Sequence, residues 1–559
     1  MRIIAASMLC SLALLLPAGP AWAQNAAPAP ARPAYHSPTS APGFRIAGTV
    51  VNAATGEPVW RATVSLLSYA DQHAIESVET GSDGRFAFEG LPAAKYPLTA
   101  SKRGFRNASY DEHGGYSTAI VTGADQDTSG LVFRLVPGAA LHGVVTGDGG
   151  DPVEGAEVML FLKPRGHNPG DRIAQVGIAT TDDTGAYEFD NLAAGEYLVA
   201  VKAEPWYALH RSDAETQRPA NDPSAALDVA YPVTFFDSTT DEASASPIVL
   251  AGGSREEANL NLRAVPSLRL SVQAPTASNE GMAGLTLEQT IFGSQIPSGR
   301  GPVSTSPQSK MAEFTGVAPG HYELTQGNPP RVTELDATAS QQVDPSLGTP
   351  SVAISGTTRI ASGAPLTGKL TLILSPLDTA HPTEPKFATS NQGSFRFPSV
   401  QPGKWELLAW GGDPAGPGRQ ITVVSTASAG KANAGNLITV RDKPVSLTVT
   451  LSDSDTRVEG FARKEGKGRA GALIALVPKD PAAFRARLRI DQSDSDGSFS
   501  LRDVAPGEYT VMAIEDGWDL DRTRPEAFAR YLSQGIAVTV TESSGKLVRL
   551  SESVPVAGR

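Results

Sequence analysis

The feature that most constrains the fold is a short hairpin sequence that recurs five times. Each copy has alternating apolar residues after a Gly-containing turn, then a Pro-Gly or similar turn, and then an aromatic residue. In every copy the aromatic follows the second apolar strand position by eight residues: Phe88 and Tyr96, Phe189 and Tyr197, Phe314 and Tyr322, Phe397 and Trp405, Leu501 and Tyr509. Alternation with a period of two predicts strands with one buried face.

A second repeated element precedes four of these hairpins. It is a Gly-rich turn, most often Gly-x-Pro, that leads into an apolar strand, and its copies begin at Gly56, Gly150, Gly363 and Gly468. A short Gly-containing strand lies upstream, as at residues 46–50, and an apolar strand closes the unit, as at residues 131–135 and 260–262. Short alternating strands at turn-rich spacing predict an all-β chain of tandem antiparallel sandwiches.

In the order of these elements the chain resembles the carboxypeptidase regulatory-like modules, relatives of the transthyretin (prealbumin-like) sandwich. The resemblance covers nearly all of the chain after residue 42, although the third repeat lacks the first turn motif. It implies a seven-stranded, Ig-like or prealbumin-like antiparallel sandwich for each repeat. It transfers no catalysis, because function belongs to sites and not to folds.

The predicted organisation follows from the repeats. It comprises a signal peptide (1–23), an Ala/Pro-rich linker (24–42), sandwich 1 (43–136), sandwich 2 (137–264) with an insertion (205–247), a degenerate sandwich 3 (265–348), sandwich 4 (349–453) and sandwich 5 (454–559). Pro near the start of two segments, 480–484 and 524–528, predicts short helices, which we expect in solvated connections of sandwich 5.

The first 23 residues have the pattern of an export signal. Arg2 precedes an apolar stretch at residues 3–16, and Ala21-Trp22-Ala23 forms a small-x-small cleavage pattern. The only cysteine, Cys10, lies within this segment. We therefore expect an exported protein (periplasmic, cell-surface or secreted) without disulfides, and with no transmembrane span after cleavage.

Charge and motif content exclude several kinds of site. A net charge of −12 argues against a nucleic-acid partner, because phosphate contacts need clustered basic residues. No cofactor or metal is predicted: His73 and Glu76 imitate a zinc pair without a third ligand. Residues 492–503 imitate a calcium loop with Gln at the first position and Asp at the last, and calcium binding there is left open.

Aromatic residues outside the repeat pattern are the candidate ligand-binding residues. They are Trp60, Trp206, Tyr207, Tyr231 and Phe235, of which the last four lie in the insertion of sandwich 2. Exposed aromatic rings can stack on sugar rings, and insertions that a fold does not require often carry function. The alternative for each ring is that it caps a core edge or an interdomain seam.

The sequence thus favours an exported, non-catalytic cell-envelope protein that binds carbohydrate or an envelope or extracellular protein through sandwich surfaces. One rival is a ligand-free scaffold or stalk, which predicts few aromatic residues buried between domains. The other is a hydrolase with its site in the insertion, where only Asp residues and His210 offer titratable groups.

Overall fold

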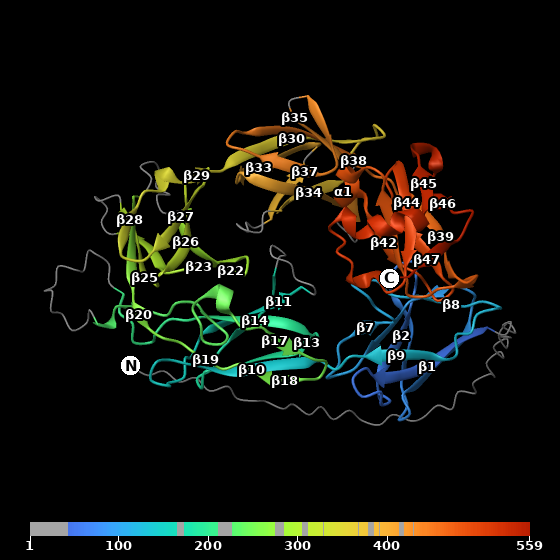
Figure 1. Ribbon diagram of the computed structural model, residues 1–559, viewed down its shortest axis with the longest axis horizontal. Coiled ribbons are helices and arrows are strands. Elements are labelled where there is room, and N and C mark those ends of the chain that lie inside the picture. The colour runs from blue at the N-terminus through green and yellow to red at the C-terminus, as the bar shows by residue number, and fades with distance from the viewer. Residues whose placement is uncertain are drawn as a thin grey trace, which may run out of the picture. The chain divides into compact units, whose positions relative to one another are not determined.

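The structure is a computed structural model that describes residues 43–164, 173–210, 226–273, 284–304, 311–327, 329–366, 368–377, 385–390, 392–412, 419–428 and 430–558. The signal peptide and the linker predicted at residues 1–42 lie outside the described residues, and so do residues 211–225 of the insertion. Residues Gly43–Arg559 form one compact unit. Within it the described residues form five β-sandwiches in sequence order, coloured from blue to red in Figure 1.

The first two sandwiches occupy residues 44–135 and 139–261. Sandwich 1 comprises β1 (Phe44–Asn52), β2 (Thr63–Leu67), β3 (Ala74–Glu79), β4 (Arg85–Leu91), β5 (Lys95–Tyr96), β6 (Leu98–Ser101), β7 (Ala108–Ser109), β8 (Ile120–Val121) and β9 (Leu131–Leu135). Sandwich 2 comprises β10 (Ala139–Thr146), β11 (Glu157–Lys163), β12 (Ala174–Thr180), β13 (Ala186–Leu192), β14 (Gly195–Lys202), β15 (Val229–Ala230), β16 (Thr234–Phe235), η3 (Glu242–Ser244), β17 (Ile248–Leu250), β18 (Arg255–Glu257) and β19 (Leu260–Asn261).

Sandwiches 3 and 4 occupy residues 265–350 and 352–452. Sandwich 3 comprises β20 (Val265–Pro266), β21 (Leu268–Gln273), β22 (Thr286–Ile291), β23 (Ser294–Pro297), β24 (Arg300–Ser304), β25 (Met311–Val317), β26 (Gly320–Gln326), β27 (Arg331–Ala337), β28 (Gln341–Val343), η4 (Pro345–Leu347) and β29 (Thr349–Pro350). Sandwich 4 comprises β30 (Val352–Ile360), β31 (Lys369–Pro376), β32 (Lys386–Ser390), β33 (Ser394–Val400), β34 (Gly403–Gly412), β35 (Arg419–Ser428), β36 (Lys431–Ala434), β37 (Leu437–Val440) and β38 (Val445–Ser452).

Sandwich 5 occupies residues 457–557 and carries α1 and four 3-10 helices. It comprises β39 (Arg457–Lys464), β40 (Lys467–Gly468), β41 (Leu473–Pro478), η5 (Pro481–Ala483), α1 (Phe484–Arg487), β42 (Arg489–Gln492), β43 (Ser498–Leu501), β44 (Gly507–Ile514), η6 (Gly517–Asp519), η7 (Pro525–Gln534), β45 (Ile536–Val540), η8 (Glu542–Ser544), β46 (Leu547–Arg549) and β47 (Val554–Ala557).

All five sandwiches share one strand arrangement. In one sheet the first strand pairs antiparallel with the hairpin strand and parallel with the closing strand, as β1 does with β4 and β9. The equivalent first strands are β10, β21, β30 and β39. Each of these sheets therefore contains at least one parallel pair, although the family resemblance implies antiparallel sandwiches. The facing sheet is built on the strand after the Gly-rich turn, for example β3-β2-β6-β7.

The repeated aromatic has the same hydrogen bond in every copy. Each ring is buried, and its polar atom donates to the backbone carbonyl four residues earlier. The five pairs are Tyr96 and Pro92 (3.1 Å), Tyr197 and Ala193 (2.9 Å), Tyr322 and Ala318 (2.7 Å), Trp405 and Gln401 (3.0 Å), and Tyr509 and Ala505 (2.6 Å). A buried ring that also satisfies a turn carbonyl explains the fixed eight-residue spacing.

A buried hydroxyl ties the hairpin to the Gly-rich turn in three of the copies. Thr80 Oγ1 accepts from the backbone N–H of Ala62 (2.9 Å) and donates to the carbonyl of Val59 (2.6 Å). Thr181 and Ser493 make the equivalent pair of bonds in sandwiches 2 and 5. The two repeated elements are therefore one structural unit, because the buried hydroxyl and the buried backbone groups of the turn satisfy each other's hydrogen bonds.

Each sandwich has its own hydrophobic core, made by alternating residues of its strands. In sandwiches 4 and 5 the two layers are joined by hydrogen-bonded strands into one nine-stranded sheet each. Phe86 and Phe88 are both buried with ring centroids 6.2 Å apart, as the alternation predicts. The short helices predicted at 480–484 and 524–528 are present, but the expectation that they are solvated is wrong. Phe484 and Phe528 pack against each other in a second apolar cluster of sandwich 5.

Candidate functional site

Trp206, which is exposed, and Tyr207, which is half-buried, form an aromatic pair on sandwich 2. They lie in a turn closed by the N–H of Ala208 and the carbonyl of Pro205 (2.9 Å). The Trp206 side chain is 86% exposed, and its ring meets the ring of Tyr207 edge to face with centroids 5.7 Å apart. This pair offers a rigid apolar surface with polar edges to a partner.

The other two aromatic candidates of the insertion face inward. Tyr231 packs against the core of sandwich 2, and burial raises its pKa to about 12. Phe235 is 3% exposed and packs edge to face against Phe292 of sandwich 3, with centroids 5.2 Å apart. The four insertion aromatics therefore do not form one surface, and the ring of Phe235 is not available to a ligand from solvent.

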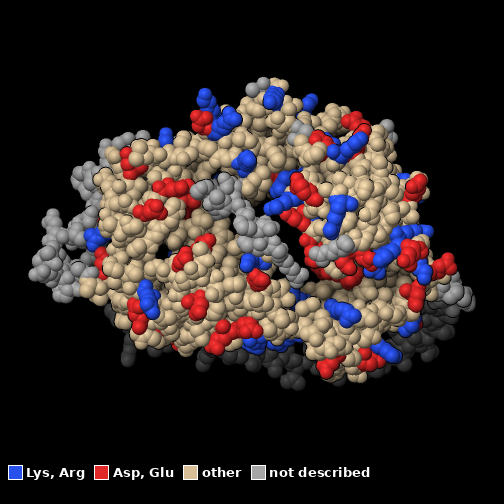
Figure 2. Space-filling model, in the orientation of Figure 1, with Lys and Arg blue, Asp and Glu red and all other residues tan. Residues whose placement is uncertain are grey.

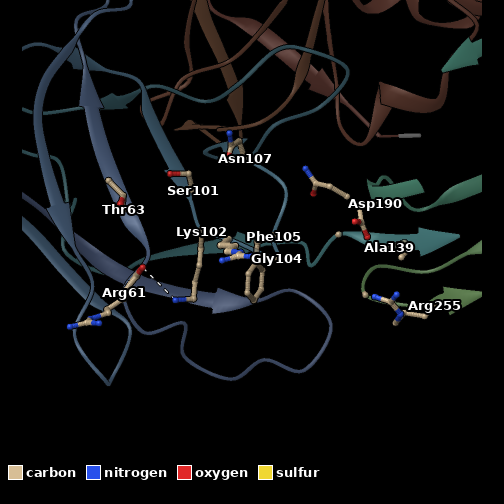
Figure 3. A pocket seen from close by; sticks show the side chains of 15 residues that line it. Arg61, Thr63, Ser101, Lys102, Gly104, Phe105, Asn107, Ala139, Asp190 and Arg255 are labelled. Atoms are coloured by element: carbon tan, nitrogen blue, oxygen red, sulfur yellow. Dashed lines mark hydrogen bonds between the residues drawn. The ribbon is translucent and has the colours of Figure 1, made fainter. Parts of the chain in front are cut away.

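Trp60 lies on sandwich 1 and directly precedes Arg61, which lines a polar pocket of about 890 Å³ (Figure 3). Its side chain is 55% exposed, and the guanidinium of Arg61 lies 4.8 Å from its ring centroid. Lys102 Nζ donates to the carbonyl oxygen of Trp60 (2.5 Å), which fixes the turn to the pocket wall.

Basic side chains dominate the walls of this pocket. Arg61, Lys102 and Arg103 come from sandwich 1, and Arg255 comes from sandwich 2 opposite them, with Asp190 nearby (Figure 3). Arg255 is paired with Glu188 (2.6 Å). On the face shown in Figure 2, acidic and basic side chains are interspersed. On a chain of net charge −12, this basic pocket is a place where an anionic group can be held.

The insertion of sandwich 2 builds an apolar seam with sandwich 3. Phe292 lies between β22 and β23, and its ring contacts both Phe161 of β11 (5.1 Å between centroids) and Phe235 of β16. The seam is one buried cluster: Met159, Phe161, Leu198, Ala200, Val233, Phe235, Ile291, Phe292 and Ile296. The alternative that an off-pattern aromatic fills an interdomain seam therefore holds for Phe235.

A buried polar network extends the same seam around His210. Nε2 of His210 lies 2.9 Å from Glu204 and Nδ1 lies 3.3 Å from Asp228. Hydrogen bonding to Glu204 raises the pKa of His210 above its usual value, against the opposing effect of burial. Ser267 of sandwich 3 donates to Asp228 rather than to the imidazole, so these groups lack the serine–histidine contact of a hydrolytic triad.

Sandwiches 1 and 5 are joined by a buried ion pair that the sequence did not reveal. Lys95 Nζ lies 2.6 Å from Asp494 Oδ2, and the two side chains are 28% and 5% exposed. Burial raises the pKa of Asp494, and Asp494 holds the pKa of Lys95 above its usual value against the effect of burial. A carboxylate buried at this depth needs its cationic partner.

Neither metal-like motif is arranged as a metal site in the described part of the chain. His73 contacts Asp71 (2.6 Å), while Glu76 lies on β3 with an exposed side chain. In the calcium-like segment Asp494 pairs with Lys95, and Asp496 accepts from the N–H of Ser498 within its own turn (2.9 Å). Over the described ranges no group of three His, Cys, Asp or Glu residues could hold a metal ion.

Among the residues that the structure describes, no helix is both long and apolar enough to cross a membrane.

Sequence comparison agrees with the strand arrangement. The model of the carboxypeptidase regulatory-like domain family matches residues 45–136 and again residues 140–228. Sandwich 1 and most of sandwich 2 thus each match the model of this domain, in tandem. Over these two ranges the chain is similar to the carboxypeptidase regulatory-like domain family. The matched ranges contain the repeated hairpins that carry the resemblance, with Tyr96 and Tyr197.

The chain is also similar to parts of several other proteins. A fibrinogen-binding protein of Staphylococcus epidermidis is 29% identical over 150 residues, which cover 24% of this chain and 13% of that protein. The Bacillus anthracis TIE protein is 9% identical, with 92% of this chain and 74% of that chain covered and a TM-score of 0.16. The minor pilin GBS52 of Streptococcus agalactiae is 13% identical, with 42% and 100% covered and a TM-score of 0.19.

Proposed function

We propose that this chain is an exported, non-catalytic protein of the cell surface or envelope that binds a protein partner through Trp206 and Tyr207. The regulatory-like domains supply the framework, and the fibrinogen-binding relative supports a protein as the partner class. Export rests on the signal pattern of residues 1–23.

The observation that carries the proposal is the exposure of Trp206. A tryptophan is usually well buried, and a ring that is 86% exposed leaves most of its apolar area in water. Trp and Tyr are the residue types most enriched where protein partners bind tightly, because they add contact area at little cost in side-chain entropy. The turn that holds Trp206 and the edge-to-face contact with Tyr207 preorganise the pair.

The contacts between sandwiches support a binding protein over a ligand-free stalk. A stalk predicts few aromatic residues buried between its domains. Here three phenylalanines fill the seam between sandwiches 2 and 3, and Trp518 of sandwich 5 stacks on His113 of sandwich 1. The domains are held against one another, which suits a surface that must keep its geometry.

The hydrolase alternative draws no support from the insertion. His210 is the only histidine there, and its two ring nitrogens face the carboxylates of Glu204 and Asp228. The nearby hydroxyl of Ser267 is bound to Asp228. Among the described residues of the insertion this is the arrangement of a structural network, and none of their hydroxyls contacts the imidazole.

Immobilised fibrinogen and a glycan array are the first probes for this proposal. We compare the wild-type chain with the Trp206→Ala/Tyr207→Ala variant, and with Phe387→Ala as a matched control, because Phe387 on β32 is also exposed (65%). Loss of protein binding by at least tenfold in the double variant alone supports the site. Binding that both variants retain, or no binding to protein by folded chain, contradicts it.

A second candidate, binding of acidic carbohydrate, is favoured by the pocket beside Trp60. The exposed indole of Trp60 lies beside the guanidinium of Arg61, which lines the pocket together with Lys102 and Arg103. The indole can stack on a sugar ring while these cations hold a carboxylate or sulfate. On the same array Trp60→Ala should lower binding to acidic glycans and leave neutral glycans unaffected. Equal binding by wild type and variant would exclude Trp60 from the site.

A further inference from the structure

The first and last sandwiches of the chain contact each other through specific polar bonds. Ser495 N–H donates to the carbonyl of Ala119 (3.0 Å), and Val121 N–H donates to Ser495 Oγ (2.8 Å). The N–H of Ala119 donates to Asp494 Oδ1 (3.1 Å). The loop before β43 of sandwich 5 therefore lies along residues 119–121 of sandwich 1 in the manner of an added strand.

Buried Gln492 fixes the same contact beside the ion pair. Its side chain is 1% exposed, and its amide nitrogen donates to the carbonyl of Asp111 (2.5 Å) and to Thr118 Oγ1 (2.8 Å). Its amide oxygen lies 3.3 Å from His113 Nδ1. Every polar atom of this amide is thus satisfied by sandwich 1, and separation of the two sandwiches would remove all three partners at once.

Aromatic rings close the edge of the contact. The indole of Trp518 is stacked on the His113 imidazole, with centroids 5.4 Å apart and an interplanar angle of 12°, and lies 5.8 Å from the ring of Tyr116. Two cations lie over the ring of Tyr69 of sandwich 1, the ammonium of Lys95 and the guanidinium of Arg502 of sandwich 5. Each is 5.4 Å from the ring centroid. These rings shield the ion pair from water, which strengthens it.

Comparison between repeats shows that Asp494 is used differently from its counterpart. Asp182 stands three residues before the turn glycine of sandwich 2, as Asp494 does in sandwich 5. Asp182 is exposed and binds only its own turn, through Thr184 and the N–H of Ala186. The carboxylate of Asp494 accepts one hydrogen bond from its own turn, from Ser498 Oγ (3.3 Å). Its other hydrogen bonds come from sandwich 1, from Lys95 Nζ and from the N–H of Ala119.

We propose that the contact between sandwiches 1 and 5 is a permanent intramolecular lock in which the Lys95 ammonium takes the place of a metal cation in the calcium-like loop of residues 492–497. The lock makes sandwich 1 depend on sandwich 5, at a separation of 399 residues along the chain, and prevents the five sandwiches from extending as a stalk. The partner for this surface is the chain's own other end.

The test removes the ammonium and follows the amides that the lock protects. In Lys95→Met, amide exchange in a peptide spanning residues 117–123 should accelerate at least tenfold, while the core strands β2 and β41 stay protected. The matched control is Lys479→Met, which removes the same charge from an exposed pair with Glu508 (2.9 Å) within sandwich 5. It should leave residues 117–123 unchanged. Equal exchange in wild type and Lys95→Met would overturn the lock.

A second variant covers the case in which Lys95→Met fails to fold. His113→Ala removes a loop ring that stacks on Trp518, and it should accelerate exchange of residues 117–123 severalfold without exposing the core. No acceleration would overturn the lock. Sedimentation of the wild type identifies the partner: a monomer with concentration-independent protection supports the intramolecular contact. A dimer whose protection falls on dilution means that a second copy fills the surface, and overturns it.

Calcium supplies the last arm of the test. If Lys95 takes the place of the cation, millimolar Ca²⁺ should leave exchange at residues 117–123 of the wild type unchanged. A Ca²⁺-dependent loss of protection would mean that the metal competes with Lys95 for Asp494, and would overturn the assigned role of the ammonium.

Discussion

The seam between sandwiches 2 and 3 and the contact between sandwiches 1 and 5 join domains by opposite chemistry. The first buries the ring of Phe292 among Phe161, Phe235 and aliphatic side chains. The second buries a lysine, a carboxylate and an amide, each with directed partners. An apolar seam gains free energy from area and tolerates small shifts, whereas a buried polar contact gains little net energy and accepts one register only.

The difference indicates that the apolar seam mainly contributes stability, whereas the polar contact mainly specifies the relative geometry of its two domains. Consecutive domains need a seam that holds them together, and sandwich 3 supplies one with a single hairpin tip. Domains far apart in sequence must find each other, and here unpaired buried charge makes any misplaced arrangement costly. The following predictions separate these two roles, from the largest expected effect to the smallest.

Phe292→Ala should be the most damaging change. The ring is 7% exposed and contacts aromatic rings of two strands, so truncation leaves a cavity and should cost about 3–5 kcal/mol of seam stability. Urea unfolding combined with amide exchange in β14 and β22 measures this cost. Phe387→Ala, at an exposed ring, should change the same quantities by less than about 0.5 kcal/mol. Equal effects would mean that the seam is not formed in solution.

Gln492→Ala should lower the free energy of unfolding by less than Phe292→Ala does, and it should loosen only the contact between sandwiches 1 and 5. The change removes the amide that donates to the carbonyl of Asp111 and to the hydroxyl of Thr118, which should cost about 1–3 kcal/mol. Exchange should rise in residues 111–121 and not in the seam between sandwiches 2 and 3. Gln341→Ala is the matched control, because Gln341 on β28 is exposed and donates one long bond (3.3 Å) to Asp336.

The sequence predicted the sandwiches because their signals are local and repeated. Tyr96 and its four counterparts, and the Gly-rich turns, act within about 50 residues, so spacing alone reveals which strands pair. Even the helix starting at Pro525 was visible from its proline. Its buried Phe528 was not expected, because the partner that covers it, Phe484, lies in another connection.

The contacts between sandwiches could not be predicted in the same way. Lys95 precedes the repeated Tyr96 and has the appearance of an ordinary turn residue, and Asp494 resembles the exposed Asp182 of another repeat. Which carboxylate becomes buried depends on how domains meet, and periodicity within a domain carries no information about that. The aromatic candidates show the same limit: of the residues in the insertion, Trp206 is exposed and Phe235 fills a seam.

The two contacts should respond to acid in different pH ranges. Burial raises the pKa of Asp491, beside the lock, to about 6, against a usual value near 4. The folded state therefore binds a proton at Asp491 more tightly than the unfolded state does. The stability contributed by this protonation is complete below pH 4. It is lost by about 1 kcal/mol per pH unit as the pH rises through 6. Of the charged neighbours, Asp494 raises this pKa and Lys95 lowers it.

In the seam, the contribution of His210 is full below about pH 6.5 and is lost as pH rises through its raised pKa, because Glu204 and Asp228 stabilise the protonated ring. Urea unfolding between pH 4 and 9, followed by exchange at each contact, checks both ranges. Asp491→Asn should flatten the response of residues 111–121 between pH 4 and 6 and leave the seam unchanged. His210→Gln should flatten the pH response of the seam above pH 6.5 and leave the response of residues 111–121 unchanged. One shared pH response for both contacts would contradict the assignment.

Trp206→Ala should have the smallest effect on folding. The ring belongs to neither contact and is 86% exposed, so its removal should change the free energy of unfolding by less than about 0.5 kcal/mol. Phe235→Ala, in the same insertion, should cost about 3 kcal/mol and accelerate exchange across the seam. The insertion then divides into a part that joins two domains and a part left free for a partner. A large loss of stability in Trp206→Ala would place that ring in the architecture and remove it from the binding surface.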